Sequence, residues 1–418
     1  MNKSFEKNRQ NFIKLISDSS VVILDSGQAP HKTTDQYYYY TPNRNFFFLT
    51  GLNEESMRLM IVKGVKETFT FLFIEETTEY MRKWVGEKMS KEEASEISGI
   101  PSSKIYFHSE FEQLFRSLMT YARGLGIKPP KNLYLDLYRH KPNLEPISLV
   151  QCSNILKVYP ELKVLNANKE LSYLRMFKSE ADIASLSEAI NITNKGLNRI
   201  MDALKIRDNE QQIEADFLHE ITLNKSEGNS FNTIAASGVN ATVLHYENNN
   251  GDLNKGDLLL CDLGALYKNY GSDITRTYPI NGKFSKRQKE IYEIVLKTNK
   301  ETIEFIKPGI TWKELNSFSK NMLISECKKI NLIKKDEEIN NYYYHSIGHF
   351  LGLDVHDVGQ YDQPLSEGMV ITVEPGLYIK EEGIGIRIED DILITKDGSI
   401  NLSKEIIKEV KDIEEYMS

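Results

Sequence analysis

Two patterns of apolar residues alternate in the first part of the chain. Some segments repeat apolar positions with the period of an α-helix, and others form short, nearly continuous apolar runs that are typical of buried strands. The segments predicted as helices are 5–18, 110–123 and 145–157. The segments predicted as strands are 21–26, 57–64, 68–74 and 132–138. This alternation predicts an α/β layer of about one ordinary domain. Two aromatic runs, YYYY (37–40) and FFF (46–48), are interpreted as strand or core residues rather than as a binding surface.

Longer helical patterns follow a polar stretch at about 160–178. Ser179, with Asp182 three residues later, fits a capping box at the start of the first of them. The predicted helices are 180–204, 209–224, 286–306, 312–328 and a terminal helix from 403. The predicted strands are 256–263, 270–279, 369–373 and 385–395. Because the chain is too long for one comfortable core, we predict two domains, 1–170 and 171–418.

The composition of the 418 residues is ordinary for a globular protein, with 40% hydrophobic and 27% charged residues. The net charge of −8, without any block of Lys and Arg, argues against binding of nucleic acid. The first residues lack the apolar run of a signal peptide, and no stretch approaches the roughly 18 apolar residues of a membrane span. Cys152, Cys261 and Cys327 lack CxxC spacing and suit a reducing compartment. We therefore expect a cytoplasmic protein without a membrane partner.

Five segments of the second half place a possible metal ligand beside glycine or strand residues: 243–249, 261–279, 345–357, 372–378 and 383–391. The candidate ligands are Asp262, Asp273, His349, Glu374 and Glu389. Four carboxylates and one imidazole suit Mn²⁺, Co²⁺, Zn²⁺ or Fe²⁺ better than a soft ion. Without cations the carboxylates would repel one another and raise each other's pKa values. Two divalent ions would neutralise them, and such a pair generates a hydroxide nucleophile near neutral pH.

Each candidate ligand also has a structural alternative. Asp262 could end a strand, Asp273 could form an Asx turn, and His349 could be a packed core histidine. Glu374 and Glu389 sit in otherwise apolar strands, where burial of an unpaired carboxylate is costly, so a structural role is disfavoured. Four of the eight histidines fall within the five segments: His245, His345, His349 and His356.

Taken together, these segments resemble the peptidase family that contains aminopeptidase P, prolidase and methionine aminopeptidase, and bacterial aminopeptidase P above all. In the first half the resemblance is carried by YYYYTPNRNFFFLTGL (37–52) and RKWVGEKMSKEEA (82–94). In the second half it is carried by 230–238, 271–284, 352–359, 372–379 and 383–395. The resemblance implies an α+β fold, with a pita-bread catalytic domain preceded by a smaller α/β amino-terminal domain.

The same resemblance implies a site with two metal ions, for which we expect Mn²⁺. Asp273 and Glu389 would bridge both ions, Asp262 would complete one site, and His349 with Glu374 would complete the other. The implied activity is hydrolysis of the N-terminal Xaa-Pro bond of a peptide by a metal-bridging hydroxide. Glu374 would carry the proton from the attacking water to the leaving nitrogen.

Further residues match family positions that contact the substrate. His245, His345 and His356 would steady the carbonyl oxygens. Arg387 would lie near the proline-side pocket; its alternative is a charge that balances Glu389 or Asp390. Because an Xaa-Pro bond lacks an N–H, its recognition requires a shaped apolar wall, which the resemblance assigns to Tyr378, His356 and Trp84. Tyr378 and Trp84 could equally be ordinary core or surface aromatics.

In family members the tryptophan that matches Trp84 reaches the site from a neighbouring subunit, so we expect a homodimer or homotetramer. The short stretch between Glu374 and Glu389 leaves preferences beyond the proline open. The alternative activity is that of a prolidase, which cleaves only Xaa-Pro dipeptides. A metal-free creatinase or a non-catalytic binding protein of the same fold is disfavoured because all five ligands are present, and a methionine aminopeptidase by the long amino-terminal domain.

Overall fold

The computed structural model describes residues 2–120, 127–139 and 141–418 of the chain. These residues form two compact units, Met1–Arg175 and Met176–Ser418. The end that we expected for the first domain, residue 170, lies inside helix α8 (Asn168–Arg175), which belongs to the first unit. No helix of the described chain combines the length and the apolar character that a membrane crossing requires.

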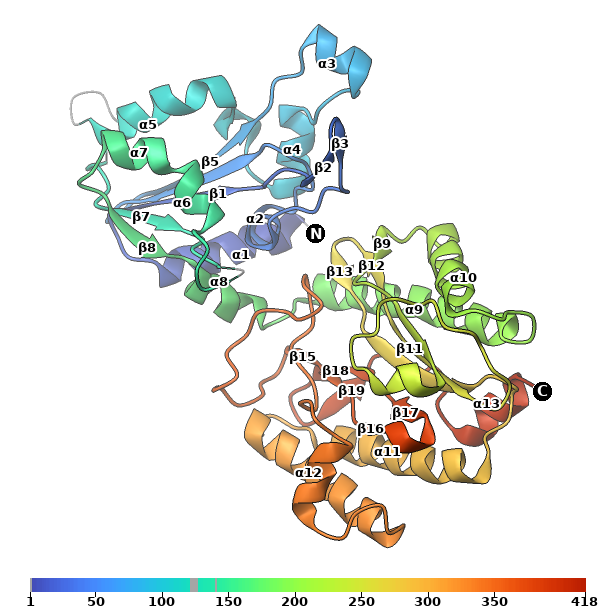
Figure 1. The fold of residues 1–418 in the computed structure, drawn as a ribbon. Helices are drawn as coiled ribbons and strands as arrows, with labels where there is room; N and C mark the ends of the chain where they lie inside the picture. Colours follow the sequence, from blue (N-terminus) through green and yellow to red (C-terminus); the bar gives the residue numbers. More distant parts are fainter. Residues whose placement is uncertain (1, 121–126, 140) are drawn as a thin grey trace. The chain divides into compact units, whose positions relative to one another are not determined.

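The first unit is built on a six-stranded mixed sheet with the order β6-β5-β4-β1-β7-β8. Its strands are β1 (Ser20–Asp25), β4 (Arg58–Lys63), β5 (Thr68–Ile74), β6 (Ile105–Phe107), β7 (Asn132–Leu135) and β8 (Lys163–Asn166). Figure 1 shows helices on both faces of this sheet. They are α1 (Asn2–Leu15), α2 (Arg44–Thr50), α4 (Lys91–Ser98), α5 (Phe111–Met119), α6 (Ile147–Gln151), α7 (Ser153–Val158) and α8.

The two aromatic runs of this unit have opposite environments. Residues 46–48 lie in α2 and are buried in the core, as predicted, but in a helix. The Asn43 side chain caps this helix at its start, and Gly51 ends it with a φ of 71°. The core interpretation is wrong for residues 37–40, because Tyr39 is 99% exposed. This run begins in the two-stranded hairpin of β2 (His31–Thr33) and β3 (Gln36–Tyr37), whose residues are exposed and lie outside the six-stranded sheet.

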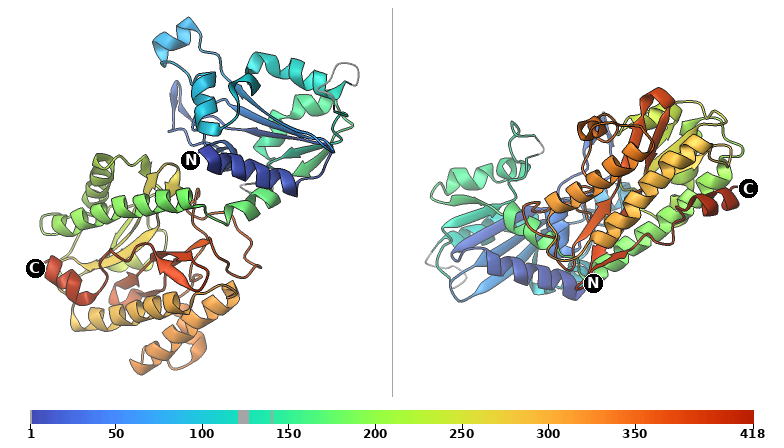
Figure 2. Two further views of the ribbon diagram at one scale, coloured as in Figure 1. Left: turned by 180° about the vertical axis from the view of Figure 1, so that it is seen from behind. Right: turned by 90° about the horizontal axis from the view of Figure 1, so that it is seen from below.

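Four long helices frame the second unit: α9 (Glu180–Ala203), α10 (Glu210–Leu223), α11 (Lys286–Phe305) and α12 (Trp312–Lys329). The predicted capping box is confirmed, because the Ser179 hydroxyl accepts from the Asp182 N–H and the Asp182 carboxylate accepts in return. Ser285 and Thr311 begin α11 and α12 in the same way. Figures 1 and 2 show α9 and α10 beside one group of strands and α11 and α12 beside another.

The strands of the second unit form four small antiparallel sheets, ordered β10-β11-β14, β13-β12-β9, β15-β18-β19 and β16-β17. The first two contain β9 (Gly228–Asn229), β10 (Ile234–Ser237), β11 (Leu258–Leu263), β12 (Ala265–Tyr267), β13 (Tyr270–Gly271) and β14 (Ile274–Pro279). The others contain β15 (Val370–Val373), β16 (Gly376–Ile379), β17 (Ile384–Arg387), β18 (Asp390–Ile394) and β19 (Ser399–Asn401). Strands β14 and β17 lie against each other, so the two groups meet.

Several predicted elements differ from the structure; for example, the helix expected at 145–157 is two helices, α6 and α7. The single strand expected at 385–395 is two strands, β17 and β18, which Ile388 and Glu389 separate. The terminal helix α13 (Val410–Tyr416) begins later than residue 403, because the backbone before it turns to accept hydrogen bonds from Arg276 at Ile406 and Ile407. The helix expected at 110–123 ends at Met119, and residues 121–123 lie outside the described residues.

Candidate metal centre

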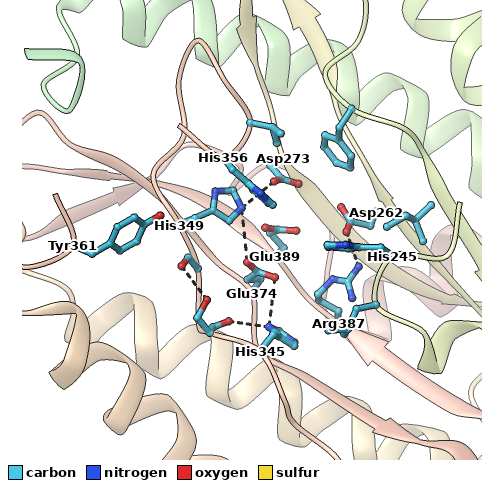
Figure 3. Close-up of a pocket in the computed structure, with 16 residues that line it drawn as sticks. His245, Asp262, Asp273, His345, His349, His356, Tyr361, Glu374, Arg387 and Glu389 are labelled. Atoms are coloured by element: carbon cyan, nitrogen blue, oxygen red, sulfur yellow. Dashed lines mark hydrogen bonds and ion pairs between the residues drawn. The ribbon is translucent and has the colours of Figure 1, made fainter. Parts of the chain in front are cut away.

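The five candidate ligands stand where strands of the second unit end or begin. Asp262 is the second-last residue of β11, and Asp273 immediately precedes β14. Glu374 follows β15, and Glu389 lies between β17 and β18. We expected both residues within strands, but the structure places both just outside them. His349 comes from the loop whose next residue, Phe350, bridges to Ile371 of β15. All five side chains line one cavity of about 390 Å³ (Figure 3).

The ligand atoms of these residues form three overlapping groups, and within each group they lie within 4.8 Å of one another. The groups are Asp262–Asp273–Glu389, His349–Glu374–Glu389 and Asp273–His349–His356. Asp273, His349 and Glu389 each belong to two groups. The arrangement therefore offers adjacent coordination positions that share carboxylates, and His356 is a sixth side chain within reach.

Burial makes the charged state of this cluster costly. It raises the pKa of Asp273 to about 6 and the pKa of Glu374 to about 7. The pKa of Glu389 is raised well above its usual value by burial and by the charges of Asp273 and Glu374. Burial alone would lower the pKa of His349, but the hydrogen bond and charge of Asp273 outweigh it and raise the pKa to about 9. Among the five candidate ligands, His349 is therefore the one group that can carry positive charge, and it faces four carboxyl groups.

Two details show that the cluster fits a divalent cation. Oδ1 of Asp262 is buried without a hydrogen-bond partner among the described residues. Nδ1 of His349 lies 3.0 Å from the carbonyl oxygen of Phe350, and Nε2 lies 3.3 Å from Oδ2 of Asp273. When His349 is neutral, donation from Nδ1 to this carbonyl leaves the lone pair of Nε2 directed at the carboxylates, as in metal-binding histidines. The donor set, oxygens with one imidazole, suits a divalent ion of intermediate hardness.

Arg387 pairs with Asp262, and not with Glu389 or Asp390 as in the alternative that the sequence left open. Its Nη2 lies 2.6 Å from Oδ2 of Asp262, in a buried ion pair. Its Nε donates to the hydroxyl of Thr275 at 3.1 Å, and this hydroxyl donates to Oε2 of Glu389 at 2.6 Å. Arg387 is therefore connected to Glu389 through Thr275, while Asp390 is paired elsewhere. Its guanidinium fixes one oxygen of Asp262 and leaves the other for a cation.

The three remaining histidines enclose the cavity from different sides (Figure 3). Burial lowers the pKa values of His345 and His356 to about 4, so both are neutral at pH 7. Nδ1 of His345 lies 3.7 Å from Oε2 of Glu374, and the ring of His356 is 4.2 Å from the ring of His349, centroid to centroid. His245 is exposed and comes from the loop after β10.

Two predicted substrate contacts do not line the cavity. Tyr378 is 2% exposed, and its hydroxyl lies 2.8 Å from Nε2 of His345 and accepts from Nη1 of Arg387 at 3.0 Å. It therefore supports two lining residues from behind. Trp84 belongs to the first unit, where it ends α3 (Glu79–Trp84) and is 72% exposed.

Our sequence analysis missed several residues of the site. The apolar and aromatic part of the cavity wall comes from Phe231, Ile234, Leu244, Val355 and Tyr361. Thr372 holds the loop of His349, because its hydroxyl accepts from the His349 N–H at 3.1 Å. Asp391 accepts from the Asp273 N–H at 3.2 Å. The segment 230–238 contains two of the wall residues, but nothing in its spacing indicates that they face the ligands.

Comparison with known proteins decides the family. Residues 184–396, half of the chain, match the model of metallopeptidase family M24. The chain belongs to metallopeptidase family M24. A second model, the N-terminal domain of aminopeptidase P, matches residues 5–125 of this M24 chain. The predicted family and the predicted α+β pita-bread fold with an amino-terminal domain are thereby confirmed. The chain is accordingly a hydrolase of a metallopeptidase family, which implies that it binds divalent metal.

Relatives extend over the whole M24 chain. The Xaa-Pro aminopeptidase of Haemophilus influenzae is 33% identical over 100% of this chain and 97% of its own length. The Xaa-Pro aminopeptidase of Escherichia coli is 31% identical over 99% and 97%. Among solved structures, a putative aminopeptidase P from Bacillus anthracis has a TM-score of 0.94 and 45% identity, covering 100% of this chain and 98% of that one. The low-pH form of E. coli aminopeptidase P has a TM-score of 0.90 and 30% identity, with the same coverage.

Proposed function

We propose that this chain is a metal-dependent aminopeptidase that hydrolyses the bond between the N-terminal residue of a peptide and a proline at the second position. The observation that carries the proposal is the cavity in which Asp262, Asp273, His349, Glu374 and Glu389 converge. The two bacterial relatives that match the chain over its whole length are Xaa-Pro aminopeptidases, which favours this activity over that of a prolidase.

We assign two divalent ions to the cavity, with Mn²⁺ as the first choice and Co²⁺, Zn²⁺ or Fe²⁺ as alternatives. Asp273 and Glu389 would hold both ions, Asp262 would complete one site, and His349 with Glu374 would complete the other. The three overlapping ligand groups support this assignment. When bound, such ions polarise a scissile carbonyl and make hydroxide available near neutral pH.

The residues of the chain supply the proton transfers and the hydrogen bonds. We assign to Glu374 the transfer of a proton from the attacking water to the leaving nitrogen, because it is a half-buried carboxylate that lines the cavity beside His345 and His349. His345 and His356, which are neutral at pH 7, would hydrogen-bond the carbonyl oxygen as negative charge develops on it. His245 would contact the substrate from the opposite wall.

The proline ring requires an apolar wall, because the Xaa-Pro bond offers no N–H for recognition. We assign this wall to His356 and to the apolar residues that line the cavity, with Tyr378 holding His345 and Arg387 behind it. We further propose that the chain forms a homodimer or homotetramer in which Trp84 of one copy reaches the cavity of another. Its exposure on α3 supports this. Three free, buried cysteines are compatible with the reducing cytoplasm as its location.

The activity is tested with metal-stripped protein and three matched peptides, an Xaa-Pro-Xaa tripeptide, an Xaa-Ala-Xaa tripeptide and an Xaa-Pro dipeptide. Each is incubated with EDTA or with Mn²⁺, and the products are identified by mass spectrometry. We expect Mn²⁺-dependent release of the first residue from the proline tripeptide and little from the alanine control. Cleavage of the dipeptide alone would replace the proposal by a prolidase. Absence of cleavage with metal bound would refute the substrate class.

The oligomer is tested separately by sedimentation of the intact chain at several concentrations. We expect a dimer or tetramer, and Trp84→Ala should raise KM for the tripeptide without changing the bound metal. A monomer with full activity would contradict the shared site.

A further inference from the structure

One wall of the cavity belongs to a loop that follows β10. This loop, residues 238–251, is called the His245 loop because it contributes His245 and Leu244 to the lining. It begins with the short helical turn η3 (Gly238–Thr242) and then has neither helix nor strand up to Gly251. A loop without regular backbone pairing needs other contacts to hold a side chain in place.

Five of those contacts come from one buried carboxylate, Glu210, the first residue of α10. Its Oε1 accepts from the backbone N–H of Ser237 at 2.7 Å, from the Ser237 hydroxyl at 2.8 Å and from Nδ2 of Asn240 at 3.0 Å. Its Oε2 accepts from the Tyr246 hydroxyl at 2.8 Å and from the Gly251 N–H at 2.7 Å. All five donors are uncharged and belong to residues 237–251, so a single anion ties both ends and the middle of the loop.

The backbone around Glu210 is shaped for this close approach. A Cβ atom on Gly251 would lie 2.6 Å from Nδ2 of Asn240 and 2.9 Å from Oε2 of Glu210, which only glycine avoids. The Glu210 N–H donates to the Gly251 carbonyl at 2.9 Å. One helical turn further on, Glu214 accepts from Nδ2 of Asn249 at 3.0 Å. Helix α10 therefore holds the loop from behind, although Glu210 and Glu214 do not line the cavity.

The opposite side of the loop packs on the metal-binding strands. A Cβ atom on Gly385 of β17 would lie 2.1 Å from the carbonyl oxygen of Ala241, so η3 is in close contact with β17. The Tyr344 hydroxyl donates to the Thr242 carbonyl at 2.7 Å and links the loop to the segment of His345. A shift of the loop would thus move His245 relative to both His345 and Arg387.

We propose that Glu210 is a positioning residue that holds the His245 loop so that His245 faces the substrate. This inference rests on the proposed function, because it gives His245 a substrate to contact. It goes beyond that function by assigning the position of His245 to a helix that contributes no side chain to the cavity.

The sharpest test is Glu210→Gln, which preserves the shape of the side chain. Each oxygen of Glu210 receives one backbone N–H, from Ser237 or from Gly251. A backbone N–H cannot become an acceptor, so either orientation of the glutamine amide leaves one of these two groups facing an NH₂. The matched control is Asp216→Asn, because Asp216 is a second buried carboxylate of α10 that pairs with Arg199 and Arg207 and does not line the cavity.

The first readout does not depend on activity. Hydrogen exchange measured by mass spectrometry should show amides of residues 238–251 exchanging at least about tenfold faster in Glu210→Gln than in the wild type. Asp216→Asn should leave that exchange unchanged. Equal exchange of the loop in Glu210→Gln and wild type would overturn the proposal, whether or not the chain cleaves Xaa-Pro bonds.

The second readout connects Glu210 to His245. Glu210→Gln should lower kcat/KM for the tripeptide by about tenfold or more, without loss of bound Mn²⁺. In a His245→Ala background the same change should cost less than about twofold, because the residue that it positions is gone. Full additivity of the two substitutions would overturn the proposal. If Glu210→Gln does not fold, Gly251→Ala replaces it, since its added methyl group disturbs the same carboxylate from the other side.

A failure of the proposed aminopeptidase activity would give a different result from a failure of the Glu210 proposal. In that case the wild type leaves the tripeptide intact while the exchange result still reports on the Glu210 contacts. The two hypotheses are therefore judged by separate measurements.

Discussion

Glu389 and Asp390 are consecutive buried carboxylates with opposite surroundings. Their side chains leave the extended backbone on opposite faces. Asp390 accepts from Nη2 of Arg276 and from the hydroxyl of Ser403, both at 2.8 Å, and from Nζ of Lys408. Burial raises its pKa, but the charges of Arg276 and Lys408 outweigh this and hold the pKa well below the usual range.

Glu389 faces the cavity and has no such partner on its side chain. Its Oε2 accepts from the Thr275 hydroxyl. Burial and the nearby carboxylates of Asp273 and Glu374 raise its pKa well above the usual value. The difference separates two uses of a buried charge. Fixed cations of the chain neutralise Asp390, whereas no side-chain cation of the described residues pairs with Glu389, which suits its proposed role as a metal ligand.

The largest effect that we expect comes from Glu389→Gln. It should lower kcat by at least about 10⁴-fold, equivalent to about 5.5 kcal/mol, because two ligand groups lose a shared member. Metal content measured by mass spectrometry should fall with it. In EDTA the melting temperature should stay the same or rise, since a neutral amide replaces a carboxylate that repels its neighbours. A strongly lowered melting temperature in EDTA would mean that Glu389 is structural.

The opposite result is expected for Asp390→Asn. This change leaves Arg276 and Lys408 without their common counter-charge in the interior, and should lower the free energy of unfolding by about 3–5 kcal/mol. Urea denaturation with EDTA present measures it. At temperatures well below the melting transition, the variant should still bind metal. Unchanged stability would show that the two carboxylates differ less than their contacts indicate.

The free energy of unfolding of the metal-free protein should depend on pH, because carboxyl groups that line the cavity have raised pKa values. Asp273 and Glu374 have folded pKa values of about 6 and about 7, above those of the unfolded chain. As the pH rises, the unfolded chain therefore releases these protons at a lower pH than the folded chain does. The free energy of unfolding falls from about pH 4 towards pH 7, by about 2–3 kcal/mol between pH 5 and 7. His349 adds to the loss, because its stabilising proton is released as the pH rises through about 9.

Saturating Mn²⁺ should reverse this trend between pH 5 and 7, since metal binding requires the ionised carboxylates. Urea unfolding at four pH values, with EDTA or with Mn²⁺, makes the comparison. A metal-free protein whose stability rises over this range would contradict the pKa directions.

The smallest effect is expected for Lys408→Met. Nζ of Lys408 contacts Asp390 and lies 2.8 Å from Oδ1 of Asn299, but Arg276 remains as the counter-charge when it is removed. We expect a loss of about 1–2 kcal/mol in the free energy of unfolding. Lys297→Met is the control, because its ion pairs with Glu301 and Glu326 are at the surface and contribute little. Equal losses of unfolding free energy in the two variants would show that the interior ion pair of Lys408 stabilises the protein no more than the surface ion pairs of Lys297.

The sequence predicted the elements whose burial is a local property. Continuous apolar runs located β1, β4, β5 and β11, and helical periodicity with a capping serine located α9. The division between β17 and β18 was not predictable in this way, because apolar residues alternate without a break from Ile384 to Ile388 and continue at Ile392. It depends on Glu389, whose N–H donates to the carbonyl of Thr275 in another sheet.

Glu374 and Glu389 were conspicuous in the sequence as candidate ligands, because an unpaired carboxylate among apolar residues is costly to bury. Their supports were not, since contacts between distant segments leave no local pattern. Arg276 donates to carbonyls near the carboxyl terminus, about 130 residues away, and this contact also explains why the terminal helix starts late. Similarly, aromatic residues at 37–40 have high strand propensity, but only the tertiary structure decides whether they are covered.

Around Glu389, side chains alternate between two faces of the extended backbone, and this alternation restricts how the segment 384–391 can change in length. The side chains of residues 387, 389 and 391 point to the cavity or contact its candidate ligands. Ile386 and Ile388 pack in the hydrophobic core, and Asp390 pairs with Arg276 and Lys408. An insertion or deletion of one residue between 384 and 389 would exchange these faces and place an isoleucine among the ligands. A change of two residues would preserve the faces. Variation in length should therefore occur in even steps here, or be absorbed before β17 at the exposed turn that ends with Gly383.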